Sequence, residues 1–266
     1  MSAPLRRRQL VADVADRLSV AGCVFAGDEA RLLIGAASSP AELERMVGSR
    51  VAGIPLEHLL GWAEFCGLHI RVDPGVFVPR RRTQFLAHQA IALARRGATV
   101  VELCCGSGAV ATVIGAARPG IRLYAADIDP AAVRCARVNL AGSAAGVFEG
   151  DLFDPLPASL RGRVDLLLAN APYVPTDAIG TMPLEARTHE PAVALDGGID
   201  GLEVQRRIAG DAASWLRPGG HLLMETGGRQ APRSREILLG HGLSVRVLHS
   251  KKLDATVVVG TRSTIG

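Results

Sequence analysis

The sequence is poor in cysteine, with five residues in 266, and none of them has the spacing of a zinc site. Cys104 and Cys105 are adjacent, so their side chains point in different directions. Five cysteines in a chain of this size do not form a disulfide framework, so we expect a reducing, cytoplasmic location. The histidines are scattered and form no metal constellation, so we expect no metal site.

Long apolar runs are absent as well. The sequence has no stretch of about 18 uncharged apolar residues, which is the length that spans a membrane, so we expect no membrane contact. The basic cluster Arg6, Arg7 and Arg8 is not followed by the apolar segment of a secretory signal. We interpret these arginines as a solvated helix face, with a nucleic-acid contact as the alternative. No internal repeat is visible.

The overall composition is that of a globular protein, with 48% hydrophobic and 21% charged residues, and it excludes wholesale disorder. Lysines and arginines number 30 against 26 acidic residues, which gives a net charge of +4. Such a small excess is compatible with a nucleic-acid or ribosome-associated partner but does not demonstrate one. The length of 266 residues suits one large domain and a small one.

The first 60 residues predict short helices. Leu10, Val14 and Leu18 recur at helical spacing, and the stretch 39–42 (SPAE) is a capping box with proline at the first helical position. Alternating apolar residues over 68–72, then Pro-Gly and another apolar pair, predict a β-hairpin. We therefore expect an N-terminal helical domain over 1–62, a hairpin linker over 63–80 and a larger domain over 81–266.

From residue 81 onward, strands and helices alternate. The patterns predict strands over 99–103, 122–127, 146–150, 164–169, 221–226, 243–249 and 255–261, and helices over 83–96, from 109, 130–140, 200–216 and 231–240. This order predicts an α/β fold in which helices cover both faces of a mostly parallel, seven-stranded sheet.

A glycine-rich loop follows the first of these strands. In VVELCCGSGAVA, Gly106, Gly108 and Ala111 form a G-x-G-x-x-A pattern between a strand and a helix. Such glycines allow a tight turn and the close approach of a ligand to the backbone. Asp127 ends the next strand, 19 residues after Gly108, where a carboxylate binds ribose hydroxyls. Dinucleotides and S-adenosylmethionine both use this geometry.

Glu102, at the end of the strand before the loop, favours S-adenosylmethionine. A carboxylate about 5 Å from a phosphate charge would cost about 3 kcal/mol at an effective dielectric constant near 20. The same carboxylate would attract the ammonium group of the methionine moiety. A structural turn with a solvated Glu102 is the simpler alternative.

The stretch LLLANAPYVP (166–175) ends a buried strand in uncharged polar groups. The Asn170 side-chain oxygen and the Ala171 backbone carbonyl can accept the N–H bonds of a planar amide or exocyclic amine, and so direct its lone pair toward a methyl donor. Pro172 fixes the turn without an N–H, and Tyr173 offers a flat face to the acceptor. The alternative is an Asx-type turn in which Tyr173 only packs.

Several segments resemble the HemK/PrmC class of protein-(glutamine-N5) methyltransferases, which modify the glutamine of the GGQ tripeptide in peptide-chain release factors. The resemblance covers nearly the whole chain, and its segments are PLEHLLGWAEFCGLHIRVDPGVFVPR, VVELCCGSGAVA, AADIDPAAVRCARVN, EGDLFDPL, LLLANAPYVP and the family-specific HEPAVALDGGIDGLEVQRRI.

The resemblance implies a class I S-adenosylmethionine-dependent methyltransferase fold of Rossmann-like type, with S-adenosylhomocysteine as product and a release factor as the protein partner. No stable nucleic-acid partner is expected. The donor site implied by the resemblance and the loop comprises Glu102, Cys104, Cys105, Gly106, Ser107, Gly108, Asp127, Asp151, Leu152 and Asn170. The acceptor amide would be held by Asn170, Ala171, Pro172 and Tyr173.

Four departures from the family pattern bear on the substrate. Ala171 replaces the first proline of Asn-Pro-Pro-Tyr, and the pair 104–105 (Cys-Cys) stands where the family usually has Gly-Thr. Leu152 occupies a position that is often aromatic. The stretch VPRRRTQF (78–85) carries arginines and Gln84 where the family commonly has acidic residues.

Two alternative functions stay open: an amino-methyltransferase acting on adenine or cytosine of RNA or DNA, and a paralogue that binds S-adenosylmethionine without catalysis. His189 and Glu190 form a possible acid/base pair, although amide methylation can release its proton to water, so a structural or substrate-contact role is preferred. We expect Trp62 and Trp215 to belong to the core.

Overall fold

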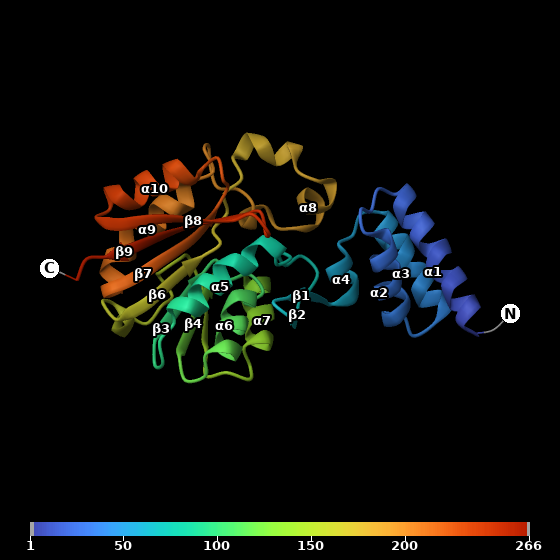
Figure 1. Cartoon of the computed structure of the whole chain (residues 1–266), viewed down its shortest axis with the longest axis horizontal. Helices are drawn as coiled ribbons and strands as arrows, with labels where there is room; N and C mark the ends of the chain where they lie inside the picture. The colour runs from blue at the N-terminus through green and yellow to red at the C-terminus, as the bar shows by residue number, and fades with distance from the viewer. Residues whose placement is uncertain (1–2, 265–266) are drawn as a thin grey trace.

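The computed structural model describes residues 3–264, so the outer limits of the expected first and last domains, 1–2 and 265–266, lie outside the described residues. Four helices form the N-terminal end of the molecule (Figure 1): α1 (Ala3–Val20), α2 (Ala26–Ala36), α3 (Pro40–Val51) and α4 (Leu56–Leu60). They enclose a hydrophobic cluster of their own, centred on Leu18, Leu33 and Val47. No helix within 3–264 is long and apolar enough to cross a membrane.

A capping box contains two hydrogen bonds, and at the start of α3 one of the two is confirmed. The Ser39 hydroxyl accepts from the backbone N–H of Glu42 at 3.2 Å. The Glu42 carboxylate accepts from the backbone N–H of Ser38 at 2.7 Å and not from Ser39. The carboxylate bonds one residue further back because Ser38 offers its hydroxyl as a second donor to the same oxygen.

The predicted hairpin exists, but its position was wrong. Strands β1 (Trp62–Phe65) and β2 (Leu68–Arg71) pair antiparallel around a turn at Cys66–Gly67. The Pro-Gly turn at 74–75 opens a loop and not a second strand, because the Val76 N–H bonds back to the Asp73 carbonyl. The hairpin lies between the N-terminal helices and the large sheet (Figure 1).

The large sheet has seven strands in the order β5-β4-β3-β6-β7-β9-β8. The strands are β3 (Thr99–Leu103), β4 (Arg122–Asp127), β5 (Gly146–Glu149), β6 (Val164–Ala169), β7 (Leu216–Thr226), β8 (Leu243–Ser250) and β9 (Ala255–Arg262). The first five of these are parallel, whereas β9 pairs antiparallel with both β7 and β8. The predicted mostly parallel, seven-stranded sheet is confirmed.

Helices cover both faces of this sheet, which explains why its central strands are mostly apolar. Val100 and Leu166 pack with α5 (Gln84–Leu93), α6 (Ala109–Ala117) and α7 (Pro130–Asn139). The neighbouring residues Val101 and Leu167 face the opposite way, toward α9 (Glu203–Trp215) and α10 (Ala231–Gly240). Alternate side chains of a strand point to opposite faces, so most positions of a strand between two helical layers are buried, as in β3 and β6.

Two predicted helix limits were too wide. The helix predicted over 83–96 is a 3-10 turn at Arg81–Thr83 followed by α5, which ends at Leu93. The helix predicted from residue 200 begins at Glu203, because the Asp200 carboxylate first closes a turn onto the backbone N–H of Leu202. The 3-10 turn matters for the site, since it brings Arg82 and Thr83 to the edge of the sheet.

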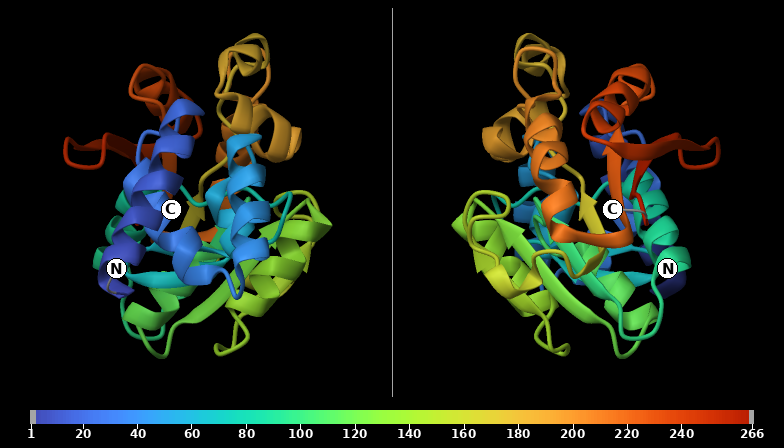
Figure 2. Two further views of the ribbon diagram at one scale, coloured as in Figure 1. Left: turned by 90° about the vertical axis from the view of Figure 1, so that its right-hand side faces the viewer. Right: turned by 90° about the vertical axis from the view of Figure 1, so that its left-hand side faces the viewer.

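The chain reverses its direction of travel across the sheet after β5. Strands β4 and β5 lie on one side of β3, whereas β6 lies on the other, so the loops after β3 and β6 leave the sheet side by side. Such a switch point opens a crevice at the carboxyl ends of the strands. The segment around α8 (Leu184–His189) projects beyond the sheet on the side of the C-terminal elements (Figure 2).

Candidate active site

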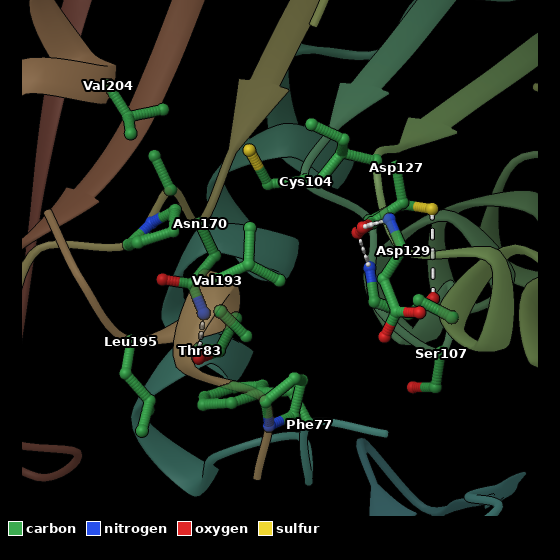
Figure 3. A pocket seen from close by; sticks show the side chains of 18 of the residues that line it. Phe77, Thr83, Cys104, Ser107, Asp127, Asp129, Asn170, Val193, Leu195 and Val204 are labelled. Carbon is green, nitrogen blue, oxygen red and sulfur yellow. Dashed lines mark hydrogen bonds between the residues drawn. The ribbon is translucent and has the colours of Figure 1, made fainter. Parts of the chain in front are cut away.

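One large cavity opens at the switch point and encloses about 1310 Å³ of empty space, including the part open to solvent. Most residues expected at the site line it: Glu102, Cys104, Cys105, Gly106, Ser107, Asp127, Asp151, Leu152, Asn170, Ala171, Pro172 and Tyr173. Asn170 and Cys104 lie on one side, and Asp127 and Ser107 lie on the other (Figure 3). Residues separated by up to 71 positions in the sequence therefore share one cavity.

Gly108 is the expected cofactor residue that does not line the cavity. It precedes α6 in the left-handed conformation, with φ 73°. A β-carbon added there would lie 3.1 Å from the β-carbon of Ala136 on α7. The structure thus requires glycine at this position for the turn and for close packing of α6 against α7.

Gly106 borders the cavity directly. Its φ is 54°, and a β-carbon added there would meet no atom within 4 Å, so the side of this residue is open space. Its N–H donates to Asp127 Oδ2 at 2.8 Å, and the N–H of Asp129 donates to Oδ1 at 2.9 Å. Each Asp127 oxygen keeps a further lone pair for a ligand hydroxyl. Burial raises the pKa of the Asp127 carboxyl.

Glu102 and Ser107 bring unpaired polar atoms to the same side of the cavity. Glu102 is 3% exposed, and its Oε2 accepts from the N–H of Ala111 at 2.8 Å, whereas Oε1 has no hydrogen bond from residues 3–264. Burial raises the pKa of this carboxyl to about 8. The buried Ser107 hydroxyl also lacks a partner among the described residues. A buried polar group without a partner is costly, so these atoms indicate a polar ligand.

The loops after β3 and β5 each place a non-glycine residue in the left-handed region at the cavity wall. Cys104 has φ 53° and Leu152 has φ 47°. Such conformations cost about 1 kcal/mol or more each, and they concentrate at functional sites. The Asp151 carboxylate accepts from Arg207 at 2.6 Å, so this side chain is already paired.

Asn170 and Ala171 supply two oxygen acceptors at the tip of β6. The Asn170 amide nitrogen donates to the Thr83 hydroxyl at 3.4 Å, which leaves the side-chain oxygen turned toward the cavity (Figure 3). The Ala171 carbonyl accepts no hydrogen bond from any of residues 3–264. Both residues line the cavity, and Asn170 is held by Thr83 of the 3-10 turn that precedes α5.

Tyr173 is held in place by contacts with three other side chains. Its hydroxyl donates to Glu225 Oε1 at 3.2 Å, and its carbonyl accepts from Gln230 at 2.9 Å. The Arg82 guanidinium lies 5.8 Å from the centre of the ring and donates to the same Glu225 oxygen at 3.1 Å. Burial raises the pKa of the Tyr173 phenol well above its usual value.

Thr83, Glu225 and Gln230 are functional candidates that sequence reasoning missed. A signal existed for Glu225: it follows the apolar residues LLM near the end of β7, just as Glu102 and Asp127 follow apolar residues near the ends of β3 and β4. No comparable signal marks Thr83, because its role depends on a contact with a residue 87 positions away.

His189 and Glu190 do not line the cavity. Glu190 is 6% exposed and accepts from Arg80 at 2.5 Å and from the backbone N–H of Val78 at 3.2 Å. It therefore ties the linker to the segment around α8, which is the structural role that we preferred. Trp215 is buried and stacks on Phe153 in the core, as expected.

Trp62, the other tryptophan expected in the core, is only half-buried. It stacks on His69 across the hairpin with a centroid separation of 3.8 Å. The expectation of a core position was therefore wrong for Trp62.

Solved structures share this fold. The chain aligns with a methyltransferase from Pyrococcus furiosus at a TM-score of 0.58 and 17% identity, covering 81% of this chain and 99% of that one. It aligns with the 16S rRNA N2 G1207 methyltransferase of T. thermophilus at a TM-score of 0.54 and 20% identity, covering 76% and 49%. The fold is therefore that of class I methyltransferases, as the sequence predicted.

Proteins found by sequence comparison have higher sequence identity to this chain than these solved structures do. Residues 67–189 match the family model described as "Methyltransferase small domain". The chain is 38% identical over 198 residues to the 4-amino-L-phenylalanine/4-methylamino-L-phenylalanine methyltransferase of Streptomyces pristinaespiralis, covering 72% of this chain and 67% of that protein. It is 41% identical over 204 residues to the release factor glutamine methyltransferase of Mycolicibacterium smegmatis, covering 76% and 72%. Such identity across most of both proteins confirms the resemblance: the chain belongs to the release factor glutamine methyltransferase family.

Proposed function

We propose that the protein transfers a methyl group from S-adenosylmethionine to the side-chain amide nitrogen of a protein glutamine, that of the GGQ tripeptide of peptide-chain release factors. The family relative from Mycolicibacterium smegmatis carries this activity in its name. The observation that carries the proposal is the pair of oxygen acceptors, Asn170 Oδ1 and the Ala171 carbonyl, in the cavity that begins at the glycine loop.

The donor end of the cavity fits S-adenosylmethionine. Glu102 Oε1 would accept from the ammonium group, Asp127 would accept from the ribose hydroxyls, and the open side of Gly106 leaves room for the chain of the ligand. When bound, S-adenosylmethionine supplies a methyl carbon made electrophilic by a positively charged sulfur. Leu152 would contact the adenine by apolar packing in place of aromatic stacking.

The acceptor end fits a neutral, planar amide. Asn170 Oδ1 and the Ala171 carbonyl would accept its two N–H bonds, so that the nitrogen lone pair points along the cavity toward the donor end. Such a group is uncharged and needs orientation more than it needs a strong base. Tyr173 provides the wall against which the amide plane would lie.

Arg80 and Arg82, which line the cavity, do not make this end of it strongly cationic. Arg82 is paired with the buried carboxylate of Glu225, and Arg80 with that of Glu190. Each pair is formally neutral, so the site stays suited to an uncharged acceptor. Replacement of the first proline by Ala171 keeps the carbonyl, which is the group the chemistry uses.

We also propose that residues 1–62 contribute to recognition of the protein substrate, with 63–80 as linker and 81–266 as the catalytic domain. The N-terminal helices contact the catalytic part through Arg50, which donates to Glu29 at 2.7 Å and to Glu185 of α8 at 2.9 Å. Since the segment around α8 contributes Met182 and Val193 to the cavity wall, a substrate bound by the helices lies close to the cavity.

The test is methylation of a purified release factor. We expect the purified protein and S-adenosylmethionine to add one methyl group in place of one hydrogen on the GGQ peptide, a net mass gain of one CH₂, and a release factor with that glutamine replaced by alanine to gain none. Total RNA and total DNA in parallel reactions test the nucleic-acid alternative. Calorimetry with S-adenosylmethionine tests the non-catalytic alternative. Tight donor binding without product on any acceptor would favour a non-catalytic paralogue.

A second candidate acceptor is a small aromatic amine. The relative from Streptomyces pristinaespiralis is named for 4-amino-L-phenylalanine and is 38% identical to this chain. The cavity is lined by Phe77 and Leu195 in addition to Tyr173, and these apolar walls suit a benzene ring. Product formed on 4-amino-L-phenylalanine at a higher kcat/KM than on the release factor would make this the preferred function.

A further inference from the structure

Glu225 is a buried carboxylate behind the acceptor end of the cavity. It lies at the end of β7, is 1% exposed and does not itself line the cavity. Its Oε1 accepts from Arg82 and Tyr173, whereas its buried Oε2 makes no hydrogen bond within 3–264. The Thr83 side chain faces the same carboxylate.

Thr83 lies between Glu225 and Asn170. It is 4% exposed, and its hydroxyl oxygen accepts from the Asn170 amide nitrogen. A hydroxyl has a single hydrogen, so when its oxygen accepts from Asn170 that hydrogen points elsewhere. An ionised carboxylate only accepts hydrogen bonds, and it therefore attracts the Thr83 hydrogen toward itself.

We propose that Glu225 is a positioning residue: its ionised carboxylate orients the Thr83 hydroxyl, and the Thr83 oxygen in turn orients the Asn170 amide. With this orientation, Asn170 presents its oxygen to the cavity. The inference rests on the proposed function only for its consequence, since the oxygen is the group that would accept the N–H of the methyl acceptor.

Without the negative charge of Glu225, the Thr83 hydroxyl hydrogen is no longer attracted toward that carboxylate. The Thr83 hydroxyl can then donate to the Asn170 oxygen, and the amide can rotate to present its NH₂ group to the cavity. An NH₂ group facing the N–H of an acceptor amide offers no lone pair, so the acceptor loses one of its two partners. Glu225 acts in this way through two other residues and touches no substrate.

Burial raises the pKa of the Glu225 carboxyl, and its neighbours Thr83, Arg82 and Tyr173 act against this rise. Arg82 from the 3-10 turn supplies the positive charge, and Tyr173 from the loop after β6 supplies an O–H donor. These are the titratable and charged groups that face it.

The orientation of the Asn170 side-chain amide can be followed by NMR without measuring turnover, because the sequence contains only two asparagines. Only Asn139 and Asn170 occur in the chain, so selective side-chain ¹⁵N labelling of asparagine gives two NH₂ signal pairs. Asn170→Asp identifies one pair by removing it. Asn139 is an internal reference, because its amide donates to the Arg71 and Ser107 carbonyls and contacts neither Thr83 nor Glu225.

We expect the Asn170 signals to shift as the pH falls and Glu225 takes up a proton, while the Asn139 signals stay. Glu225→Gln should abolish the pH dependence, and Thr83→Val should move only the Asn170 pair. A pH-dependent shift that persists in Glu225→Gln, or Asn170 signals unchanged by Thr83→Val, would overturn the proposal. These results stand whether or not any acceptor is methylated.

Turnover supplies the second readout. With an acceptor that the wild type methylates, we expect Thr83→Val to lower kcat about tenfold, the worth of one hydrogen bond, and to leave S-adenosylmethionine affinity unchanged. Thr83→Ser keeps the hydroxyl and should stay within about twofold of wild type. Wild-type kcat in Thr83→Val, or an equal loss in Thr83→Ser, contradicts the proposal, and a melting curve for each variant checks that it is folded.

Discussion

The donor end and the acceptor end of the cavity differ in whether their polar side chains already have hydrogen-bond partners within the protein. At the donor end, Glu102 Oε1 and the Ser107 hydroxyl have no partner within residues 3–264, and the open side of Gly106 leaves space. At the acceptor end, the side chains of Asn170 and Tyr173 are both bonded to other side chains. One end keeps polar atoms for a ligand, whereas the other fixes its own geometry.

This difference matches what each ligand offers. A charged donor with hydroxyl groups can satisfy unpaired atoms, and its binding offsets the cost of burying them. A neutral amide has little charge to attract, so its orientation must come from groups that are already in place. We therefore expect substitutions at the donor end to change affinity and substitutions at the acceptor end to change turnover.

Asn170→Ala should produce the largest effect and separate the two ends most clearly. Removing one of the two oxygen acceptors should lower turnover at least about 100-fold, or about 2.7 kcal/mol in activation free energy. Donor affinity should stay within a few-fold, because the donor end is intact. Methyl transfer to the release factor and calorimetry with S-adenosylmethionine measure the two quantities; wild-type turnover in this variant would refute the proposed mechanism.

Glu102→Gln tests the donor end through charge. Loss of a carboxylate beside the ligand ammonium should weaken S-adenosylmethionine binding about 30-fold at pH 7.5, or about 2 kcal/mol. Titration calorimetry compares the variant with the wild type, and Glu225→Gln serves as a matched control that loses a buried carboxylate at the other end. Equal donor affinity in wild type and Glu102→Gln would show that the ammonium binds elsewhere.

The affinity for S-adenosylmethionine should also depend on pH, and Glu102→Gln should remove this dependence. The pKa of Glu102 is about 8 in the free protein, so most of the carboxyl is protonated at pH 6. Binding a cation requires the ionised form, so wild-type affinity should rise by up to about tenfold per unit between pH 6 and 7.5. Above this range the ligand ammonium, with a pKa of about 8, begins to lose its own proton. Glu102→Gln should show no such rise.

A pair of glycine variants tests whether open space at the donor end is used by the ligand. Gly106→Ala adds a methyl group where no atom lies within 4 Å, so we expect donor affinity to fall about tenfold. Gly108→Ala instead places its methyl 3.1 Å from Ala136, so we expect a lower melting temperature. Both positions have positive φ and carry similar backbone strain. Unchanged donor affinity in Gly106→Ala would place the ligand away from the loop.

The two ends also differ in how far the sequence predicts them. The donor end is local: Glu102, Gly106 and Asp127 fall within 26 residues, and a strand, a turn and a strand fix their relation. The acceptor end joins Thr83, Asn170 and Glu225, which meet only because β6 and β7 are neighbours in the sheet and the 3-10 turn at Arg81–Thr83 lies against the ends of both. The motif around Asn170 was therefore predictable, whereas its supports were not.

The hairpin and the helix limits show the same distinction. Most strands of the large sheet were predicted to within one residue at each end, because burial on both faces leaves continuous apolar runs bounded by turns. The exception is β7, which begins at Leu216, five residues before the predicted start. The hairpin turn at Cys66–Gly67 was missed because Pro-Gly at 74–75 is the stronger local signal. Cys66 has φ 51°, a conformation that residue type alone does not indicate.

Cys104→Gly should have the smallest effect and shows how much of the donor end is backbone. Cys104 has φ 53°, so glycine relieves strain of about 1 kcal/mol while adding flexibility to the unfolded chain and losing the packing of one sulfur. The net change should stay within about 1 kcal/mol, or about 3 °C in melting temperature. Donor affinity should stay within about twofold, since the backbone path of the loop is unchanged. A large loss of affinity would mean that the sulfur itself contacts the donor, and the recognition at this end would then include a side chain that the family pattern lacks.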